Sequence, residues 1–235
     1  MPGKDVMERS PLRVFERAIG GGLGQGNIGV VLSRPGVGKT GFLVGLALDA
    51  LLQGRKVLHI STKEPVERLR EFYDQIFRNL ADDLGLDNRV QRHLEMERHR
   101  HILVYNRKLF SLEKLENSVA FLKDAAHFKP SLVIMDGTPR YEKSEPWEIE
   151  GLADLARKWE AEIWTSSHMH REEQEINAAG IPTDVARYEQ WLAVILKLEP
   201  TADHIRLRIL RDRGRTDIAD LQMELDPATL LLKWH

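Results

Sequence analysis

Cysteine is absent from the 235-residue sequence, so the chain forms neither disulfides nor thiolate metal sites. It also lacks any apolar run near the roughly 20 residues that a helix needs to cross a bilayer, and we expect no membrane partner. Residues 1–22 are charged and have no apolar centre of the kind found in signal peptides, which predicts a cytoplasmic protein. The formal net charge of −2 gives no general attraction to nucleic acids or membranes, so binding to either requires a local patch.

Short apolar strands alternate with amphipathic helices along most of the sequence. We expect strands at residues 27–33, 56–62, 101–106, 131–137 and 162–167. We expect helices at residues 40–54, 65–85, 111–128 and 144–161. The polar stretch 86–101 fits either a helix or a loop. Strands that read as continuous apolar runs between helices are typical of a parallel sheet covered on both faces.

After about residue 188 the pattern changes to short strands joined by turns. These strands are expected at residues 191–199, 204–212, 220–226 and 230–234. Turns of this length join antiparallel strands, because parallel strands need longer crossover connections. We therefore predict an α/β fold with a mostly parallel central sheet, helices on both faces and a C-terminal antiparallel extension. A composition of 42% hydrophobic residues suits one domain over residues 1–235.

A glycine-rich segment joins the first strand to the first helix. Its residues are Ser33, Arg34, Pro35, Gly36, Val37, Gly38, Lys39 and Thr40. Glycines allow a sharp turn that aims backbone N–H groups at phosphate oxygens, and the helix N-terminus adds partial positive charge. In such a loop the Lys39 ammonium reaches the terminal phosphates and the Thr40 hydroxyl ligates Mg²⁺. The segment predicts ATP and Mg²⁺ as cofactors, and a plain glycine turn with a solvated lysine is the alternative.

A serine stands where such loops usually begin with glycine. Ser33 is small and lies at a strand end, so we expect it to be tolerated if the backbone there needs no positive φ. The acid that a magnesium site requires is supplied by Asp136, which follows the apolar run 132–135. Ligands of open α/β sheets bind at the carboxyl ends of strands, which places Asp136 in the magnesium shell. A turn-forming aspartate is the alternative.

These motifs resemble those of the RecA-like ATPases, especially the branch of DnaB-type replicative helicases and KaiC-like proteins. "RPGVGKT" resembles the helicase form of the loop, and "GGGLGQGNIGVVLS" resembles the entry to KaiC-like domains. "VLHISTKEPVERL" resembles their second strand, "TSSHMHR" falls where the helicases carry a γ-phosphate sensor, and "LRDRGR" resembles their basic finger. The resemblance spans most of residues 15–225 and implies a RecA-like ATPase.

One position departs from that family's pattern. The resemblance implies a glutamate after the second strand that polarises the attacking water, but the aligned residue is Lys63, with Glu64 one place later. Alternate strand residues face opposite sides, so Glu64 reaches the nucleotide only if the strand has ended, as the following Pro65 favours. A helix-start acid favoured by the helix dipole is the other interpretation of Glu64. Because losing a water-orienting group costs about 10²–10⁴-fold in rate, we expect slow or absent hydrolysis.

His168 ends the strand expected at residues 162–167. The resemblance implies that it senses the γ-phosphate by donating a hydrogen bond, and a histidine bonded to nearby backbone is the alternative. Further histidines are His93, His99, His101 and His170. No cluster of acids or thiols frames them in the sequence, so we expect no metal site there.

Two arginines, Arg211 and Arg213, flank a tight turn near the C-terminus. The resemblance implies that they reach the γ-phosphate bound by the next subunit and stabilise the charge of the transition state. That role requires a head-to-tail homo-oligomer such as a hexameric ring. A solvated hairpin tip is the alternative.

In RecA-like motors the segments after the third and fourth core strands touch the nucleic-acid strand, which points to residues 138–146 and 171–184. The second segment is acidic, and the first balances Arg140, Tyr141 and Lys143 against acids. A loop that tracks phosphates should be basic, often with stacking aromatics. The basic run 88–101 is another candidate patch, but acids interrupt it. DNA is therefore a weakly supported partner.

The sequence predicts an ATP-binding RecA/KaiC-like protein: a slow Mg-dependent ATPase that works as an oligomer and couples nucleotide state to a protein partner. The alternative is a non-hydrolysing nucleotide-binding regulator or scaffold, for which Lys63 is the strongest argument. A third hypothesis is a repair or recombination ATPase that acts on single-stranded DNA.

Overall fold

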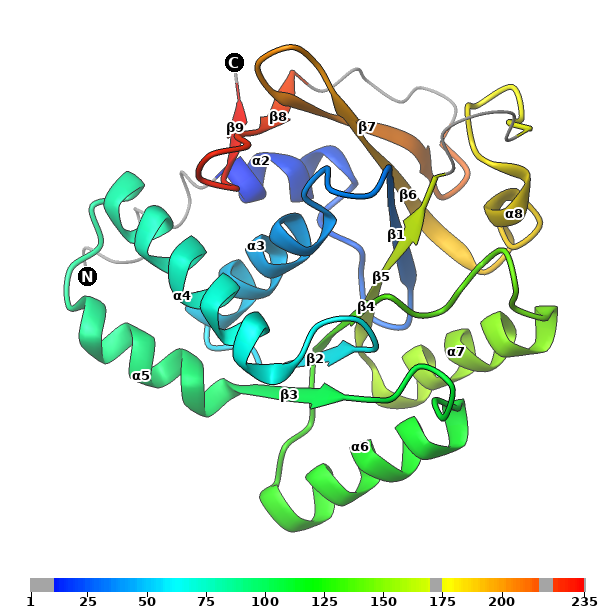
Figure 1. Ribbon diagram of the computed structural model, residues 1–235. Coiled ribbons are helices and arrows are strands. Elements are labelled where there is room, and N and C mark those ends of the chain that lie inside the picture. The colour runs from blue at the N-terminus through cyan, green and yellow to red at the C-terminus, as the bar shows by residue number, and fades with distance from the viewer. Residues whose placement is uncertain (1–10, 170–174, 216–221, 235) are drawn as a thin grey trace.

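The computed structural model describes residues 11–169, 175–215 and 222–234 (Figure 1). Its strands are, in chain order, β1 (Ile28–Ser33), β2 (Val57–Ser61), β3 (Arg100–Val104), β4 (Leu132–Asp136), β5 (Glu162–His168), β6 (Leu192–Pro200), β7 (Ile205–Asp212), β8 (Met223–Leu225) and β9 (Leu232–Trp234). In the described ranges they form one nine-stranded sheet in the order β3-β2-β4-β5-β1-β6-β7-β8-β9.

The sheet is parallel from β3 to β6 and antiparallel from β6 to β9. The prediction of a mostly parallel sheet with a C-terminal antiparallel extension is therefore confirmed. The reversal begins one strand later than the sequence pattern suggests, because β6 lies parallel to β1 and pairs in antiparallel fashion only with β7.

Helices cover both faces of the sheet, as predicted (Figure 1). They are α2 (Pro11–Ala18), α3 (Lys39–Leu52), α4 (Val66–Asp83), α5 (Arg89–His99), α6 (Leu112–Ala126), α7 (Pro146–Trp159) and the single turn α8 (Thr183–Ala186). Helices α2 to α5 pack into one buried hydrophobic cluster and α6 and α7 into the other. No helix in the described ranges is both long and apolar enough to span a bilayer.

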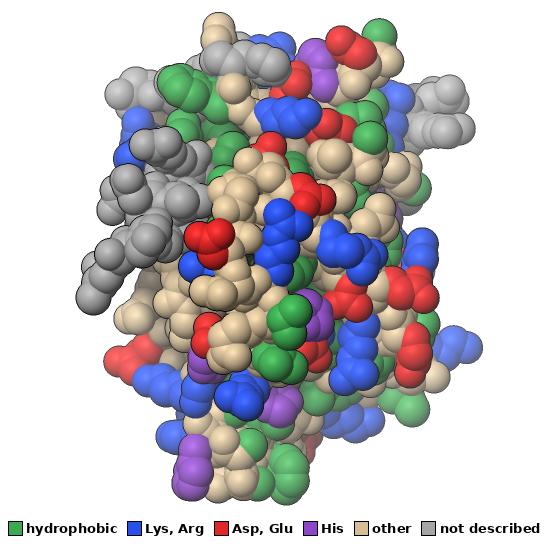
Figure 2. All heavy atoms as spheres, turned by 90° about the vertical axis from the view of Figure 1, so that its left-hand side faces the viewer, with side chains coloured by type: hydrophobic (Ala, Val, Ile, Leu, Met, Phe, Trp, Pro, Cys, Tyr) green, Lys and Arg blue, Asp and Glu red, His purple; other side chains and the backbone are tan. Residues whose placement is uncertain are grey.

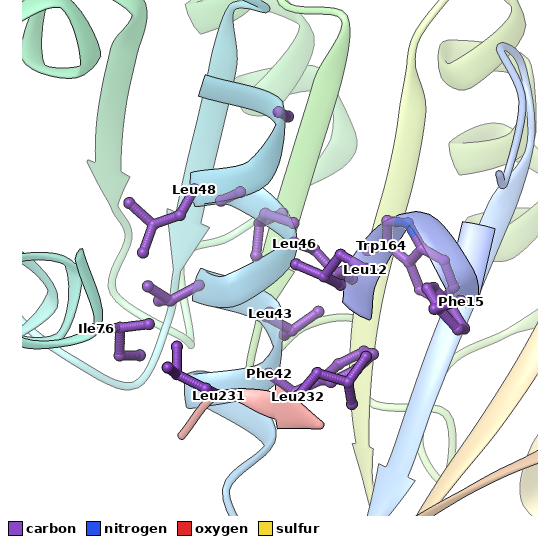
Figure 3. Close-up of a cluster of buried hydrophobic side chains, with 14 of the residues drawn as sticks. Leu12, Phe15, Phe42, Leu43, Leu46, Leu48, Ile76, Trp164, Leu231 and Leu232 are labelled. Carbon is purple, nitrogen blue, oxygen red and sulfur yellow. The ribbon is translucent and has the colours of Figure 1, made fainter. Parts of the chain in front are cut away.

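Strand residues alternate between the two clusters because successive side chains leave a strand on opposite sides. In β4, Leu132 and Ile134 face the α3 side, whereas Val133 and Met135 face α6 and α7. Figure 3 shows the α3 side, where Trp164 of β5 lies beside α2 and α3. The same alternation directs the side chain of Asp136, the last residue of β4, toward the α3 side, where the glycine-rich loop ends.

Two helices were not predicted as such. The undecided stretch 86–101 contains α5, whose periodicity is weak because Met96 is its buried residue. The short helix α2 was not predicted, although Leu12 and Phe15 are buried in the α3-side cluster. The other strand and helix ends agree with the expected ones to within two residues, except that β8 begins at Met223 and not at residue 220. The one-domain assignment stays a prediction.

Candidate functional site

The glycine-rich loop turns sharply between β1 and α3. Gly36 and Gly38 have φ values of 80° and 99°, in the left-handed region that side chains rarely adopt. A Cβ added at Gly36 would meet no atom within 4 Å, so the outer side of the loop is open. Helix α3 begins at Lys39, directly after the loop, so its first free N–H groups face the loop. This arrangement fits an anion at the helix N-terminus.

The Lys39 side chain folds back under the loop. Its Nζ donates to the carbonyl and hydroxyl oxygens of Ser33 at 2.8 and 2.9 Å and to the carbonyl of Arg34 at 3.2 Å. Lys39 is buried, and this burial lowers the pKa of its ammonium to about 8. The carboxylate of Asp136 opposes the shift, and the charge of Lys63 adds to it. A buried ammonium held only by neutral oxygens is poised to accept an anion.

Ser33 is the last residue of β1, where it pairs in parallel register with His168 of β5. Extended backbone accepts any residue, so the condition for replacing glycine by serine is met. The Ser33 hydroxyl also donates to the carbonyl of Arg34 at 2.9 Å while it accepts from Lys39. The Ser33 hydroxyl therefore joins the group of oxygens that hydrogen-bond Lys39 beneath the loop.

Asp136 is the centre of a buried hydrogen-bond group at the carboxyl end of β4. The Thr40 hydroxyl donates to its Oδ2 at 2.7 Å, and the Ser166 hydroxyl donates to its Oδ1 at 2.8 Å. The N–H of Gly137 donates to the Ser166 oxygen at 3.1 Å. Ser166 was not predicted as a site residue. The signal that could have identified it is strand alternation, since Trp164 of the same strand faces α3.

The oxygens of Thr40 and Asp136 are the ones that could hold Mg²⁺. A hydroxyl and a carboxylate are hard oxygen donors, which Mg²⁺ prefers, and it binds few of them because it keeps several waters. The pair lies beside the first turn of α3, where phosphate oxygens of a ligand would complete the shell. The residues present therefore fit a magnesium ion bound together with a nucleotide, which stays a prediction for both residues.

Lys63 and Glu64 lie in the connection between β2 and α4. Strand β2 ends at Ser61, whose Oγ accepts from the N–H groups of Lys63 at 3.1 Å and Glu64 at 2.8 Å. The Lys63 Nζ lies 3.4 Å from Oε1 of Glu64. Burial is the main cause of the lowered pKa of Lys39 and of His168, and the nearby Lys63 charge lowers both further. Glu64 is thus outside the strand, as its catalytic role requires, but paired with a cation; that role stays a prediction.

His168 is the exposed last residue of β5. Partial burial lowers its pKa, and the charges of Lys39 and Lys63 lower it further, against the opposing carboxylate of Asp136. It borders a cleft of about 430 Å³ beside the glycine-rich loop. Other residues lining this cleft are Pro35, Arg107, Gly137, Arg140 and Ser166. A neutral imidazole at this edge could donate or accept a hydrogen bond, so its sensor role stays a prediction.

Both finger candidates are held by their own chain. The Arg211 Nε donates to the carbonyl of Leu192 at 3.1 Å, and its Nη1 lies 3.4 Å from a carboxylate oxygen of Glu189. Arg213 donates to the carbonyls of Ile19 at 2.9 Å and Gly22 at 2.8 Å. Arg213 therefore fastens the turn after β7 to the segment after α2. A contact with the next subunit would have to replace these bonds, and it stays a prediction.

In the two segments considered for DNA binding, the one aromatic side chain that could have stacked on a base is not available. Tyr141 is fully buried and hydrogen-bonds Thr165 at 2.8 Å, so it offers no stacking surface. Arg140 forms an ion pair with Glu142 at 2.6 Å. Residues 171–174 of the acidic segment, and His170 before it, lie outside the described residues. The described part of these segments provides no basic, aromatic track.

No family model matches the sequence. The chain is similar to the DNA repair protein rhp55 of Schizosaccharomyces pombe, with 38% identity over 65 residues. The aligned stretch covers 26% of this chain and 19% of that relative, so the chain matches about a fifth of the relative's length. The similarity concerns one stretch of a DNA repair protein, and it leaves the branch of DnaB-type and KaiC-like proteins without confirmation.

Proposed function

We propose that this chain binds Mg·ATP at residues 33–40, with Thr40 and Asp136 at the metal. The observation that carries the proposal is the hydrogen bond of 2.7 Å between these two side chains beside the first turn of α3. It brings a hydroxyl and a carboxylate together where an anion meets a helix N-terminus. The lowered pKa of Lys39, about 8, still leaves its ammonium mainly charged at neutral pH.

The residues of the loop have separate roles in this proposal. Lys39 exchanges its bonds to the oxygens of Ser33 and Arg34 for phosphate oxygens, which satisfy its charge better than neutral carbonyls do. Gly36 and Gly38 let the backbone N–H groups approach the phosphates. Bound Mg²⁺ supplies neutralisation of phosphate charge, and Asp136 with Ser166 behind it holds the position of that ion.

We further propose that the protein is a slow ATPase of the RecA/KaiC-like type that works as an oligomer and couples nucleotide state to a protein partner. The pairing of Glu64 with Lys63 supports slow turnover, because a carboxylate that is engaged by an ammonium is less free to orient an attacking water. The same pairing supports the second candidate, a nucleotide-binding regulator that does not hydrolyse ATP. The two candidates share the binding site and differ only in the rate of the chemical step.

A third candidate, an ATPase that acts on single-stranded DNA, draws support from the similarity to a DNA repair protein. The burial of Tyr141 and the ion pair of Arg140 speak against the segment after β4 as its DNA contact. Binding of a labelled oligonucleotide at rising salt separates this candidate from the others, since phosphate contacts weaken steeply with ionic strength. An affinity that does not respond to salt, or no binding with ATP present, removes it.

The first experiment measures ATP affinity by calorimetry and phosphate release on the same samples. We expect Mg-dependent binding that Lys39→Ala abolishes. Lys129→Ala is the matched control. Lys129 is exposed and ion-paired with Glu160, and it precedes β4, so it lies at the opposite end of that strand from Asp136. Equal affinity in the wild type and Lys39→Ala would falsify the proposed site. Light scattering with and without ATP measures the molecular mass and so the number of subunits in the oligomer.

The substitution Lys63→Glu separates the slow ATPase from the regulator. It places an acid where the RecA-like resemblance implies one and removes the cation that pairs with Glu64. For a slow ATPase we expect phosphate release to rise at least about tenfold while the affinity for ATP changes little. The control Lys63→Ala removes the cation without adding an acid. No release from either variant, with binding intact, supports the regulator.

A further inference from the structure

A second cluster of chemistry-bearing side chains lies on α4 and α5, away from the glycine-rich loop. Figure 2 views this side of the molecule, where histidines lie among acidic and basic side chains. Asp74 belongs to α4, while His93 and Glu97 stand four residues apart on α5 and so share one helix face. One ligand atom from each of the three residues lies within 4.8 Å of the other two. None of these residues takes part in the proposed nucleotide site.

We propose, contrary to the expectation from the sequence, that Asp74, His93 and Glu97 bind a divalent transition-metal ion of the zinc type. The His93 Nε2 lies 2.9 Å from Oδ1 of Asp74. A zinc ion about 2.0–2.2 Å from imidazole nitrogen and carboxylate oxygen requires its ligands roughly 3–4 Å apart. The three ligand atoms, which lie within 4.8 Å of one another, are close to this spacing. One imidazole and two carboxylates leave a coordination position for water, as in open zinc sites.

A buried arginine, Arg100, donates a hydrogen bond to one of the two carboxylates in this cluster, that of Glu97. The side chain of Arg100 is 2% exposed and its Nη2 donates to Oε1 of Glu97. Its Nη1 has no hydrogen-bond partner among the described residues, and its guanidinium lies 4.2 Å from the ring centre of Tyr73. Metal-binding carboxylates are generally held by a second hydrogen bond of this kind. A surface ion pair needs no such buried support.

The cluster is also accessible from solvent. The side chains of His93 and Asp74 are 36% and 41% exposed. Asp74 also borders a hollow of about 280 Å³ on the outer side of α4. An ion can therefore enter without unfolding of either helix, which is a requirement for a real site.

A bound ion would cross-link α4 to α5. Tyr73, the neighbour of Asp74, contacts Nδ1 of His59 in β2 at 3.0 Å through its hydroxyl group. His59 is buried in β2, which pairs with β4. The cross-link would thus brace the helix pair that packs on the strand next to β4.

The test is zinc titration of tag-free, nucleotide-free protein by calorimetry, with cobalt absorption as a second readout. We expect one ion per chain, and at least about tenfold weaker binding in His93→Ala and in Glu97→Gln. The matched control is His204→Ala. That histidine also contacts two carboxylates, those of Asp203 and Glu224, but the three do not form a ligand cluster.

Thermal unfolding gives an independent measure, because an ion that binds only the folded state raises the melting temperature. Zinc should raise it in the wild type and in His204→Ala but not in Glu97→Gln, which keeps the size of the side chain if His93→Ala fails to fold. The proposal is overturned if no zinc binds. It is equally overturned if the two cluster variants bind zinc as tightly as the wild type does, or if only His204→Ala loses it.

Discussion

The Thr40 hydroxyl donates a hydrogen bond to Oδ2 of Asp136 at 2.7 Å, although 96 positions separate the two residues in the sequence. Both are buried, one at the first turn of α3 and the other at the end of β4. The contact exists because β4 directs alternate side chains toward α3. It joins the glycine-rich loop to the neighbouring strand end without a ligand, so the proposed metal position is largely built before an ion binds.

The substitution Asp136→Asn should remove the Mg-dependent part of ATP binding. An amide keeps the size and can still accept from Thr40, but it lacks the charge that holds a divalent cation. We expect ATP affinity with Mg²⁺ to fall about tenfold or more, while affinity in a metal chelator changes little. Calorimetry under both conditions measures the difference. Asp154→Asn is the control, since Asp154 is exposed on α7 beside Arg157; an equal loss there contradicts the assignment.

The free energy of unfolding of the ligand-free protein should depend on pH because of the lowered pKa of Lys39. Burial lowers the pKa of this ammonium from 10.5 to about 8 in the folded chain, so between these values only the unfolded chain keeps the proton. Stability rises with pH wherever the unfolded state binds more protons. Relative to Lys39→Met, the wild type should therefore gain stability as pH rises from about 8 to 10.5. Urea unfolding at pH 7.5, 9 and 10 measures the difference, and a flat or falling one refutes the lowered pKa.

Loss of Arg213 should loosen the N-terminal segment. Its guanidinium donates to the carbonyls of Ile19 and Gly22 and to the buried carboxylate of Asp212. We expect Arg213→Ala to lower the free energy of unfolding by about 1–3 kcal/mol. Arg208→Ala, which removes an exposed ion pair, should change it by about 0.5 kcal/mol or less. If Arg213 acts only across subunits, unfolding stays unchanged and only ATP turnover falls.

Two glycines one turn apart in α3 should respond to alanine with opposite signs. A Cβ on Gly41 would lie 2.8 Å from Cδ1 and 3.1 Å from Cβ of Leu230, whereas one on Gly45 would meet no atom within 4 Å. Gly41→Ala should cost about 1–3 kcal/mol of stability by overpacking. Gly45→Ala should add about 0.5–1 kcal/mol, because alanine restricts the unfolded chain. Urea unfolding of both variants tests the pair; a stable Gly41→Ala protein contradicts the close packing of the C-terminal loop on α3.

Most helices and strands could be predicted because their signals are local. The apolar runs of the strands and the glycine-rich loop occupy consecutive residues, so the sequence shows them directly. Helix α5 was left undecided because Met96 alone of its residues is buried. A single buried residue produces no helical spacing of apolar positions in the sequence. The burial of Tyr141 was missed for a related reason, since its partner Thr165 lies in β5, 24 positions later in the sequence.

By itself the sequence determined the α/β order of elements, the glycine-rich loop and the acid that ends β4, since each depends on neighbouring residues. Only the tertiary structure decided which distant side chains meet. It placed Ser166 behind Asp136, fastened Arg213 to the segment after α2, and brought Asp74 beside His93. These contacts depend on strand register and helix packing, which arise from the summed burial of two hydrophobic clusters and leave no local pattern in the chain.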